Sequence, residues 1–346
     1  MTFQAPGEVR VEERPAPTLT APDDAIVRVE ASGICGSDLH LYHGRIPLEA
    51  GFILGHEFVG MITAAGPGVT DVAVGDRVLG CFVTACGRCF FCRRRDFHKC
   101  TEGRVFGHGK ALGGLQGAQA EQVLVPHANL TLRRVPPGLS IDAALFAGDV
   151  MGTGFHAVRS AEVAPGDVVV VLGLGPVGLC AVQVARALGA GQVIAVDTVP
   201  ERLAMAERFG GTPVHLTEQD PKAAVRKATS GRGADACIDA VGHPDALDLA
   251  CRLARNGGTI SVTGVYSERC QVHMGLIWIK ALTLRTGQAN VIGHVDAVLA
   301  MMTAGRLDPT PLVSRHVPLA DAPEAYAAYA RREALRSSSR PDHLMA

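Results

Sequence analysis

The sequence has almost no excess charge of either sign. Its 33 lysines and arginines are balanced by 34 aspartates and glutamates among 346 residues, and the net charge is −1. A chain so close to neutral has no strong electrostatic attraction for nucleic acid or for an anionic membrane surface. We therefore expect neither nucleic acid nor membrane as a partner.

Long hydrophobic runs are also missing. The stretch VVVVLGLGPVGLC, at residues 168–180, is interrupted by glycines and is shorter than the about 20 apolar residues that cross a bilayer as a helix. The first residues, MTFQAPGEVRVEERPAP, mix acidic, basic and proline side chains, which is not the pattern of a secretory signal. We expect a soluble protein of the cytoplasm.

Four of the ten cysteines are concentrated within fifteen residues. In the reducing cytoplasm, clustered thiols are more often metal ligands than disulfides. The spacing C-x2-C-x2-C-x7-C brings four thiolates onto one loop, which suits a closed, tetrahedral, structural zinc site. Iron–sulfur ligation and a disulfide framework are weaker alternatives, and a single cluster in a neutral chain does not indicate a nucleic-acid finger. The four residues are Cys86, Cys89, Cys92 and Cys100.

The hydrophobic pattern divides the chain into three stretches, and a hydrophobic content of 47% excludes extensive disorder. Residues 1–147 carry short strands bounded by turn residues, such as DAIVRVEASG and FVGMITAAGPG. Residues 148–286 alternate apolar strands with long helices, which indicates a parallel sheet covered on both faces. Residues 287–346 mix helix and strand and end in a polar tail, SSSRPDHLMA, that we expect to be loosely ordered.

A glycine-rich motif begins the second stretch. GLGPVG follows an apolar strand and opens a helix, which is the context that makes G-x-G-x-x-G typical of a dinucleotide site. Such glycines allow a tight turn, close approach of a pyrophosphate, and close packing of helix and strand. The helix N-terminus then offers N–H groups to the anion. The residues of this phosphate loop are Gly173, Leu174, Gly175, Pro176, Val177 and Gly178.

Asp197 closes the next strand, where a carboxylate would bond the adenosine ribose 2′-hydroxyl. A 2′-phosphate about 4 Å from an ionised Asp197 would cost roughly 4 kcal/mol per charge pair at an effective dielectric near 20, or about three orders of magnitude in affinity. The sequence therefore favours NAD over NADP. Arg202 lies close enough to soften this preference, although a solvated position on the following helix is the better explanation of this residue.

A second set of candidate metal ligands is scattered along the chain. Cys35 lies in GICGSDLH, His56 in GHE, and Asp149 in GDVMGTGFH. Three ligands from different elements plus one exchangeable position are typical of a catalytic zinc site. Each residue also has a simpler explanation, namely a core cysteine, a buried histidine and a helix N-cap. Spacing alone favours a catalytic metal only slightly over these explanations.

Over nearly its whole length the chain resembles the zinc-dependent medium-chain alcohol dehydrogenases. The resemblance rests on GICGSDLH, GHEFVG, GDRV, the four-cysteine loop, TGFHA and GLGPVG, which occur in the family's order. The stretch GKALGGLQGAQAEQVLVP is most similar to bacterial members grouped with alcohol and formaldehyde dehydrogenases. The long insertion of the glutathione-independent formaldehyde enzymes is missing.

This resemblance implies an α/β protein of two domains that clasp NAD and a catalytic zinc. A GroES-like, β-rich catalytic domain would comprise residues 1–147 and 287–346, and a Rossmann domain with a doubly wound parallel sheet residues 148–286. By position, Cys35, His56 and Asp149 match the ligands of the catalytic zinc, and the four-cysteine loop would hold a second, structural zinc. Glu57 matches a residue that approaches the catalytic zinc, and Asp38 matches the carboxylate that orients its histidine.

The implied activity is hydride transfer between a small alcohol, or its aldehyde or ketone, and NAD. Zinc would stabilise the alkoxide, while Ser37 takes the proton and passes it through the nicotinamide ribose to His40. A polyol or threonine-type dehydrogenase of the same fold is an alternative, because the substrate pocket cannot be read from the sequence. A non-catalytic, zinc-stabilised redox sensor is an alternative of another class, although the Ser37–His40 pair argues against it.

Assembly and the chain ends carry further expectations. The resemblance implies a homodimer or homotetramer, built partly by the edge of the Rossmann sheet. Trp278 is expected in the core, with a pocket or a subunit contact as alternatives. The start, MTFQAPGEV, is shorter than the first strand of family members, and REALRSSSRPDHLMA lacks their apolar final strand.

Overall fold

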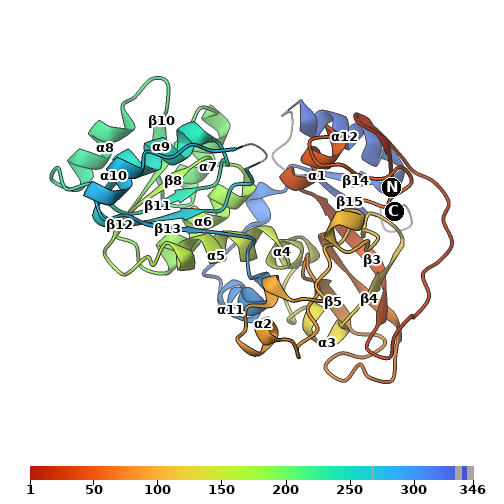
Figure 1. The fold of residues 1–346 in the computed structure, drawn as a ribbon. Helices are drawn as coiled ribbons and strands as arrows, with labels where there is room; N and C mark the ends of the chain where they lie inside the picture. Colours follow the sequence, from red (N-terminus) through yellow and green to blue (C-terminus); the bar gives the residue numbers. More distant parts are fainter. Residues whose placement is uncertain (267–268, 332–336, 341–346) are drawn as a thin grey trace. The chain divides into compact units, whose positions relative to one another are not determined.

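The computed structural model describes residues 1–266, 269–331 and 337–340. They form two units, drawn in Figure 1: residues 1–152 with 290–346, and residues 153–289. The boundaries expected from the sequence, 147/148 and 286/287, lie close to these. No helix in the described part of the chain is long and apolar enough to span a bilayer.

The first unit is built on a seven-stranded sheet with the strand order β14-β15-β3-β4-β5-β7, in which β6 also pairs with β3. The long central strand β3 is buried along most of its length and pairs antiparallel with β4 and β6. A separate hairpin joins β1 and β2. The strands of this unit are β1 (Thr2–Ala5), β2 (Glu8–Arg10), β3 (Ala25–Ile34), β4 (Phe58–Ala65), β5 (Arg77–Gly80), β6 (Gln122–Val125), β7 (Leu132–Arg134), β14 (Arg315–Pro318) and β15 (Ser337–Arg340).

Short helices connect these strands and set the positions of the residues described below. They are α1 (Gly36–Tyr42), α2 (Phe90–Arg93), α3 (Ala128–Thr131), α4 (Ile141–Ala147), α11 (Val291–Thr303) and α12 (Ala322–Ala330), with 3-10 turns at Phe97–Lys99, Lys110–Leu112, Thr310–Leu312 and Leu319–Asp321. Helix α5 (Val150–Ser160) begins in the first unit and continues into the second.

The second unit is a six-stranded parallel sheet with the order β10-β9-β8-β11-β12-β13. Helices α6 to α9 each begin with a proline, whose fixed φ suits the first helical position. The elements are β8 (Val168–Leu172), α6 (Pro176–Ala187), β9 (Gln192–Asp197), α7 (Pro200–Arg208), β10 (Thr212–His215), α8 (Pro221–Ala228), β11 (Ala234–Asp239), α9 (Pro244–Leu253), β12 (Ala254–Val262), α10 (Met274–Ile279) and β13 (Thr283–Thr286).

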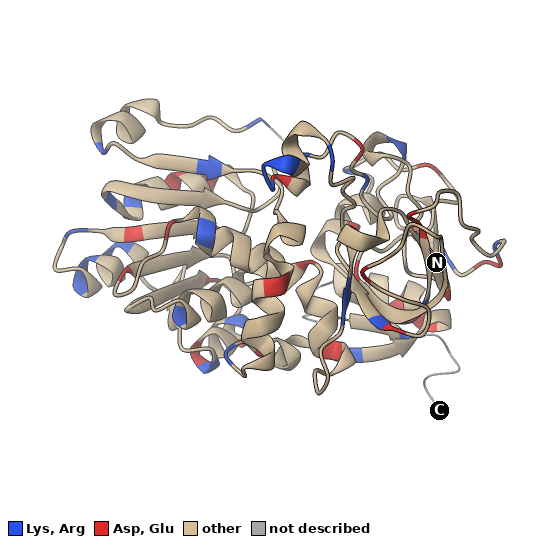
Figure 2. Ribbon diagram, turned by 90° about the horizontal axis from the view of Figure 1, so that it is seen from below, with Lys and Arg blue, Asp and Glu red and all other residues tan. Residues whose placement is uncertain are grey.

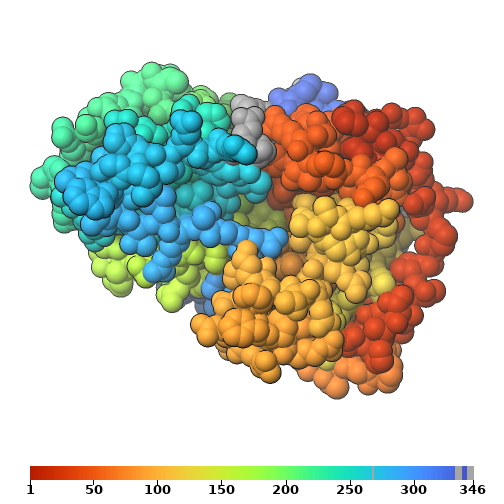
Figure 3. Space-filling view, in the orientation of Figure 1, coloured from red at the N-terminus to blue at the C-terminus, as the bar shows by residue number. Residues whose placement is uncertain are grey.

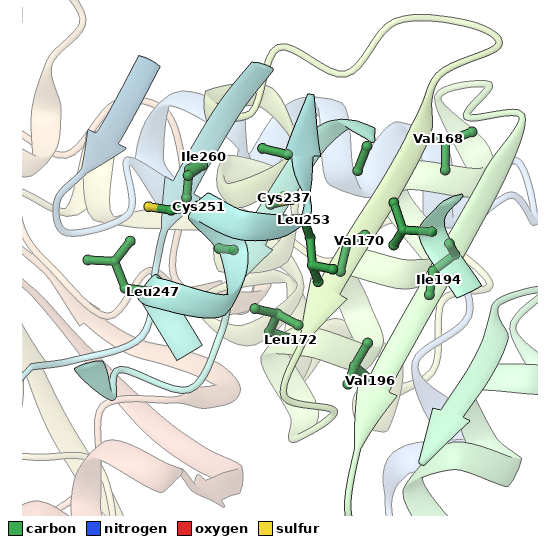
Figure 4. Packing of buried hydrophobic residues seen from close by; sticks show 14 of the residues in the cluster. Val168, Val170, Leu172, Ile194, Val196, Cys237, Leu247, Cys251, Leu253 and Ile260 are labelled. Carbon is green, nitrogen blue, oxygen red and sulfur yellow. The ribbon is translucent and has the colours of Figure 1, made fainter. Parts of the chain in front are cut away.

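The core of this unit lies between the sheet and its helices. All five residues of β8 are buried, as expected of a parallel strand that is covered on both faces. Val170 and Leu172 of β8 pack with Ile194 of β9 and with Leu247 and Leu253 of α9 (Figure 4). This packing of helices on a buried parallel sheet explains why apolar strands alternate with helices in this part of the sequence.

Charged residues of both signs are interspersed over both units, in keeping with the near-zero net charge (Figure 2). Apolar exposure is more concentrated. Trp278 of α10 is 78% exposed, and its neighbour Ile279 is 68% exposed. The expected core position of Trp278 is therefore wrong. Beside it, all four residues of the sheet-edge strand β13 are exposed.

The polar segment at residues 337–340 is also not as the sequence suggested. Instead of being loosely ordered, it forms β15, which lies between β14 and β3. A strand therefore forms here without an apolar run. Its serines are nevertheless almost completely buried. Residues 341–346 of the same tail lie outside the described residues. The short N-terminal stretch likewise forms the paired strands β1 and β2.

We expect Ser338→Val to stabilise the protein. Among the described residues Ser338 Oγ has no hydrogen-bond partner, although only 1% of the residue is exposed. Removing a buried, unsatisfied hydroxyl and adding a β-branched side chain should raise the free energy of unfolding by about 1–3 kcal/mol. Urea unfolding monitored by circular dichroism measures the change.

Ser339→Val is the matched control, because Ser339 Oγ donates a hydrogen bond to the Ser32 carbonyl at 3.3 Å. Loss of this hydrogen bond offsets the stability gained from the apolar valine side chain, so Ser339→Val should be less stable than Ser338→Val. Equal effects of the two substitutions, or a loss of stability in Ser338→Val, would contradict the account.

Candidate functional site

Four potential metal ligands from distant parts of the chain meet in the first unit. Cys35 follows β3 and caps α1, and His56 and Glu57 directly precede β4. Asp149 lies between α4 and α5. One ligand atom from each residue lies within 4.8 Å of the others. The structure thus brings together the scattered set that the sequence left undecided.

The contacts within this cluster are short. Asp149 Oδ2 lies 3.4 Å from Cys35 Sγ and 3.2 Å from His56 Nε2. His56 and Glu57 are buried, and Asp149 is 8% exposed. Thiolate sulfur, imidazole nitrogen and carboxylate oxygen are the donors that zinc takes in proteins. We therefore refer to Cys35, His56, Glu57 and Asp149 as the metal-ligand cluster.

Asp38 holds two members of the cluster in place. It is fully buried, accepts a hydrogen bond from the Cys35 backbone N–H at 2.8 Å through Oδ2, and lies 3.1 Å from His56 Nδ1 through Oδ1. A carboxylate on the far nitrogen fixes the ring of a metal-binding histidine and leaves the other nitrogen for the metal. The orienting role that the resemblance implied for Asp38 is compatible with this position and stays a prediction.

The electrostatics of the cluster favour a bound cation. Burial lowers the pKa of His56, but the Asp38 carboxylate and the hydrogen bond to Asp149 outweigh burial, and its pKa lies well above the usual value. The same carboxylates that hold a proton on the imidazole would hold a metal ion in its place, because binding of a metal displaces that proton. The cluster thus fits a divalent metal.

Ser37 and His40 lie on α1, next to the cluster. Ser37 Oγ is 3.2 Å from His56 Nε2. His40 lies three residues later, so both side chains share one face of the helix. Burial lowers the pKa of His40, with smaller contributions from Arg45 and His43. His40 is therefore neutral at pH 7 and can accept a proton.

One residue of this region was missed by the sequence analysis. The ring of His108 lies 5.0 Å from that of His56, centroid to centroid, and the residue is 6% exposed. Burial lowers the pKa of His108, and the neighbouring His56 adds to the shift. The only local signal was a histidine between two glycines, GHG, which no spacing rule connects to His56.

The four cysteines of the loop at 86–100 also lie together. One sulfur from each is within 4.8 Å of the others. Two backbone N–H groups point at these sulfurs, from Cys86 to Cys100 at 3.2 Å and from Cys92 to Cys89 at 3.5 Å. Four thiols with no further side-chain donor suit a closed tetrahedral zinc shell. The loop lies at the surface of the first unit, in orange in Figure 3.

The phosphate loop in the second unit has the geometry of an anion cradle. Gly173 has a φ of +83°, in the left-handed region. A Cβ on Gly178 would lie 1.8 Å from the Gly173 carbonyl oxygen, whereas a Cβ on Gly175 would meet no atom within 4 Å. The open space at Gly175, the N-cap of α6, is where a pyrophosphate would lie against the helix N-terminus.

Asp197 is anchored to this loop from the end of β9. Its Oδ2 accepts a hydrogen bond from the Leu174 N–H at 2.6 Å, and Oδ1 accepts from Thr198 and Val199. Arg202 Nη1 lies 3.8 Å from Asp197 Oδ2. Asp197 therefore sits beside the cradle, and Arg202 partly compensates its charge.

Two family models match the chain. The alcohol dehydrogenase GroES-like domain matches residues 21–137, and the zinc-binding dehydrogenase model matches residues 176–303. A medium chain reductase/dehydrogenase of Acremonium sp. is 43% identical over 275 residues, which cover 77% of this chain and 93% of the relative. A protein of Mycobacterium tuberculosis named "probable zinc-binding alcohol dehydrogenase" is 40% identical over 340 residues, covering 97% and 87%.

Solved structures agree with these matches. An alcohol dehydrogenase from Thermus sp. ATN1 has a TM-score of 0.95 and 44% identity, covering 98% of this chain and 99% of that one. A zinc-binding dehydrogenase of Sinorhizobium meliloti 1021 bound to NADP has a TM-score of 0.86 and 29% identity, covering 98% of both chains. The 2R,3R-butanediol dehydrogenase of Bacillus subtilis has a TM-score of 0.86 and 28% identity, covering 99% of both.

Proposed function

The chain belongs to the zinc-dependent medium-chain alcohol dehydrogenase family, and on that premise we propose that it oxidises a small alcohol, or reduces the matching aldehyde or ketone, with NAD as the hydride carrier. It is an oxidoreductase with a GroES-like and a Rossmann-type domain. The observation that carries the proposal is the convergence of Cys35, His56 and Asp149, with Asp38 behind them.

Cys35 Sγ, His56 Nε2 and an Asp149 carboxylate oxygen would hold the catalytic zinc, with Glu57 beside them. When bound, zinc supplies a Lewis acid that makes an alcohol hydroxyl more acidic, and NAD supplies the hydride acceptor. Asp38 keeps the His56 ring in the orientation that presents Nε2 to the metal. The phosphate loop would bind the pyrophosphate of the dinucleotide, and Asp197 its adenosine ribose.

The hydroxyl proton would leave through α1. Ser37 Oγ, 3.2 Å from His56 Nε2, would accept it next to the metal-ligand cluster while its own hydroxyl proton moves on toward His40. His40, on the same helix face, then holds it on its imidazole, since the lowered pKa of this histidine leaves it neutral at pH 7. Below that lowered pKa His40 is already protonated, so alcohol oxidation should slow as the pH falls through it.

The experiment that tests the proposal combines metal analysis with turnover. Protein of known zinc content is assayed with NAD and NADP on a panel of primary, secondary and vicinal alcohols. Two zinc ions per chain with NAD-dependent oxidation support the proposal. One zinc per chain and no turnover on any alcohol would instead favour the non-catalytic redox sensor.

We expect Asp197→Asn to shift cofactor preference toward NADP. The substitution removes the charge that repels a 2′-phosphate but keeps an oxygen that can accept the Leu174 N–H. The ratio of kcat/KM for NADP to that for NAD should rise about 10²-fold, somewhat less than the roughly 4 kcal/mol of one full charge pair. An unchanged ratio would mean that Asp197 does not contact the ribose.

We propose that a second copy of the chain covers the exposed apolar surface of α10 and the open edge of β13. Strand β13 has a free edge on the side away from β12, and Trp278 and Ile279 are exposed next to it. Open strand edges and exposed apolar patches are typical of surfaces where two protein chains associate. We expect a dimer or tetramer in light scattering, and a shift to monomer in Trp278→Glu. Phe90→Glu, at an equally apolar exposed position in the first unit, should leave the assembly intact. A monomeric parent protein would refute this interface.

A further inference from the structure

His108 occupies a place beside the metal-ligand cluster that the proposed chemistry does not use. Its ring packs at 67° against the His56 ring, with centroids 5.0 Å apart. His56 Nε2 in turn lies 3.2 Å from Asp149 Oδ2 and 3.2 Å from Ser37 Oγ. A group on His108 is therefore within reach of a small molecule whose hydroxyl lies at the cluster.

The backbone around His108 is specialised for this position. Gly107 and Gly109 both have positive φ values, +67° and +73°. A Cβ on Gly107 would lie 2.8 Å from the backbone nitrogen of Gly55, the residue before His56. A Cβ on Gly109 would lie 2.8 Å from the Leu48 side chain. Only glycine fits on either side, so the fold holds His108 against the segment that carries His56.

One ring nitrogen of His108 is committed to the fold. Nδ1 lies 2.8 Å from the carbonyl oxygen of Phe106, a fully buried residue. A carbonyl oxygen can only accept, so Nδ1 carries a proton and donates it. Nε2 has no hydrogen-bond partner among the described residues, and it is not one of their fully buried unpaired side-chain atoms, so it is open to a bound molecule. A ring nitrogen that is fixed in orientation and open to a bound molecule can hydrogen-bond a hydroxyl of that molecule.

We propose that His108 is a specificity-determining residue that hydrogen-bonds, through Nε2, a second hydroxyl on the carbon next to the one oxidised. This inference rests on the proposed function and names its substrate class: short vicinal diols in preference to simple alkanols. A hydroxyl suits Nε2 in either role, because it can both donate and accept. An alkanol would leave Nε2 unpaired in a site closed by substrate, which is how a polar site rejects an analogue that lacks one hydroxyl.

The test uses a pair of substrates that differ in one hydroxyl, 2,3-butanediol and 2-butanol, on zinc-loaded protein. We expect the parent protein to favour the diol in kcat/KM by roughly 10²-fold. In His108→Leu, which removes Nε2 at similar volume, the ratio of the two kcat/KM values should fall about 10- to 100-fold, mainly through KM for the diol. His108→Gln, which restores a polar side chain, should recover part of the ratio.

Two further measurements separate this role from a structural one. Saturation-transfer NMR without NAD compares the binding of both alcohols, and the diol should lose its advantage in His108→Leu. Zinc content should stay at the parent value, since a drop would make His108 a metal ligand and overturn the proposal. The control is His215→Leu, at a histidine of the second unit whose side chain contacts Thr217 and Glu218 of its own turn; this variant should keep the parent ratio.

The outcomes distinguish failure here from failure of the proposed function. If the zinc-loaded protein oxidises neither alcohol nor any other in the panel, the dehydrogenase function itself is wrong. If it oxidises 2-butanol as well as the diol, or if His108→Leu slows both substrates by the same factor, the function stands and the role of His108 is refuted.

Discussion

Replacing Cys35 with serine should reduce kcat/KM for alcohol oxidation by about 10³-fold or more and leave the fold intact. Cys35 Sγ lies 3.4 Å from Asp149 Oδ2, in a cluster whose other members are histidine and carboxylates. A catalytic metal contributes several kcal/mol of charge stabilisation in the transition state, and about 4 kcal/mol corresponds to 10³ in rate. A serine hydroxyl is a poor zinc ligand, so most of that contribution is lost.

The stability of this variant should change little, because serine is nearly isosteric and the backbone contact that positions residue 35 remains. That contact is the 2.8 Å hydrogen bond from the Cys35 N–H to Asp38. Steady-state kinetics, zinc analysis and thermal unfolding are measured on the same preparation. Cys270→Ser, a free cysteine of the second unit, is the control and should retain parent kinetics and zinc. Global unfolding of Cys35→Ser, or full activity with one zinc fewer, would contradict the assignment.

Replacing Cys92 with serine should have the opposite profile, with stability lost first. Cys92 is the most buried of the four loop cysteines, at 4% exposed, and its backbone N–H points at Cys89 Sγ. A structural zinc contributes its binding free energy to folding. Losing one of four thiolates should lower the free energy of unfolding by at least about 3 kcal/mol, and the midpoint of thermal unfolding by roughly 6–12 °C.

A chelator experiment checks the cause of that loss. If zinc holds the loop, prolonged treatment with EDTA should destabilise the parent protein but hardly change Cys92→Ser. Cys81→Ala is the control, since Cys81 is buried and free in the same unit but outside both clusters. It should keep two zinc ions per chain. A Cys92→Ser protein as stable as the parent, or an abolished turnover with unchanged stability, would show that the loop is not a structural metal site.

Local motifs were readable from the sequence because their physics is local. The phosphate loop needs a glycine at +83° and a second that lies against the first one's carbonyl, and both requirements fall within six residues. The four-cysteine loop is equally self-contained. Asp149, in contrast, is 93 residues from its contact His56. No period or spacing connects them, and only the resemblance to a family placed them in one site.

The sequence analysis missed three features, namely strand β15, the exposure of Trp278 and the position of His108, because each depends on the folded structure. The pattern of β15 is polar, so hydrophobic periodicity could not reveal a strand whose burial comes from its neighbours β3 and β14. Trp278 is apolar but exposed, and an apolar run in the sequence does not by itself show whether its helix faces the core or the surface. His108 depends on two glycine conformations and on a carbonyl two residues away, and these are properties of the folded backbone.

The pairing of β15 with β3 has a consequence for biosynthesis. Ser337 lies opposite Ile34, the residue before Cys35, so the edge of the strand leading into that cysteine stays open until the ribosome has made some three hundred further residues. Every strand of the second unit lies between residues 168 and 286, and domains generally fold as units in the order in which they are made. The second unit can therefore finish folding while this edge of β3, next to Cys35, still waits for its partner strand.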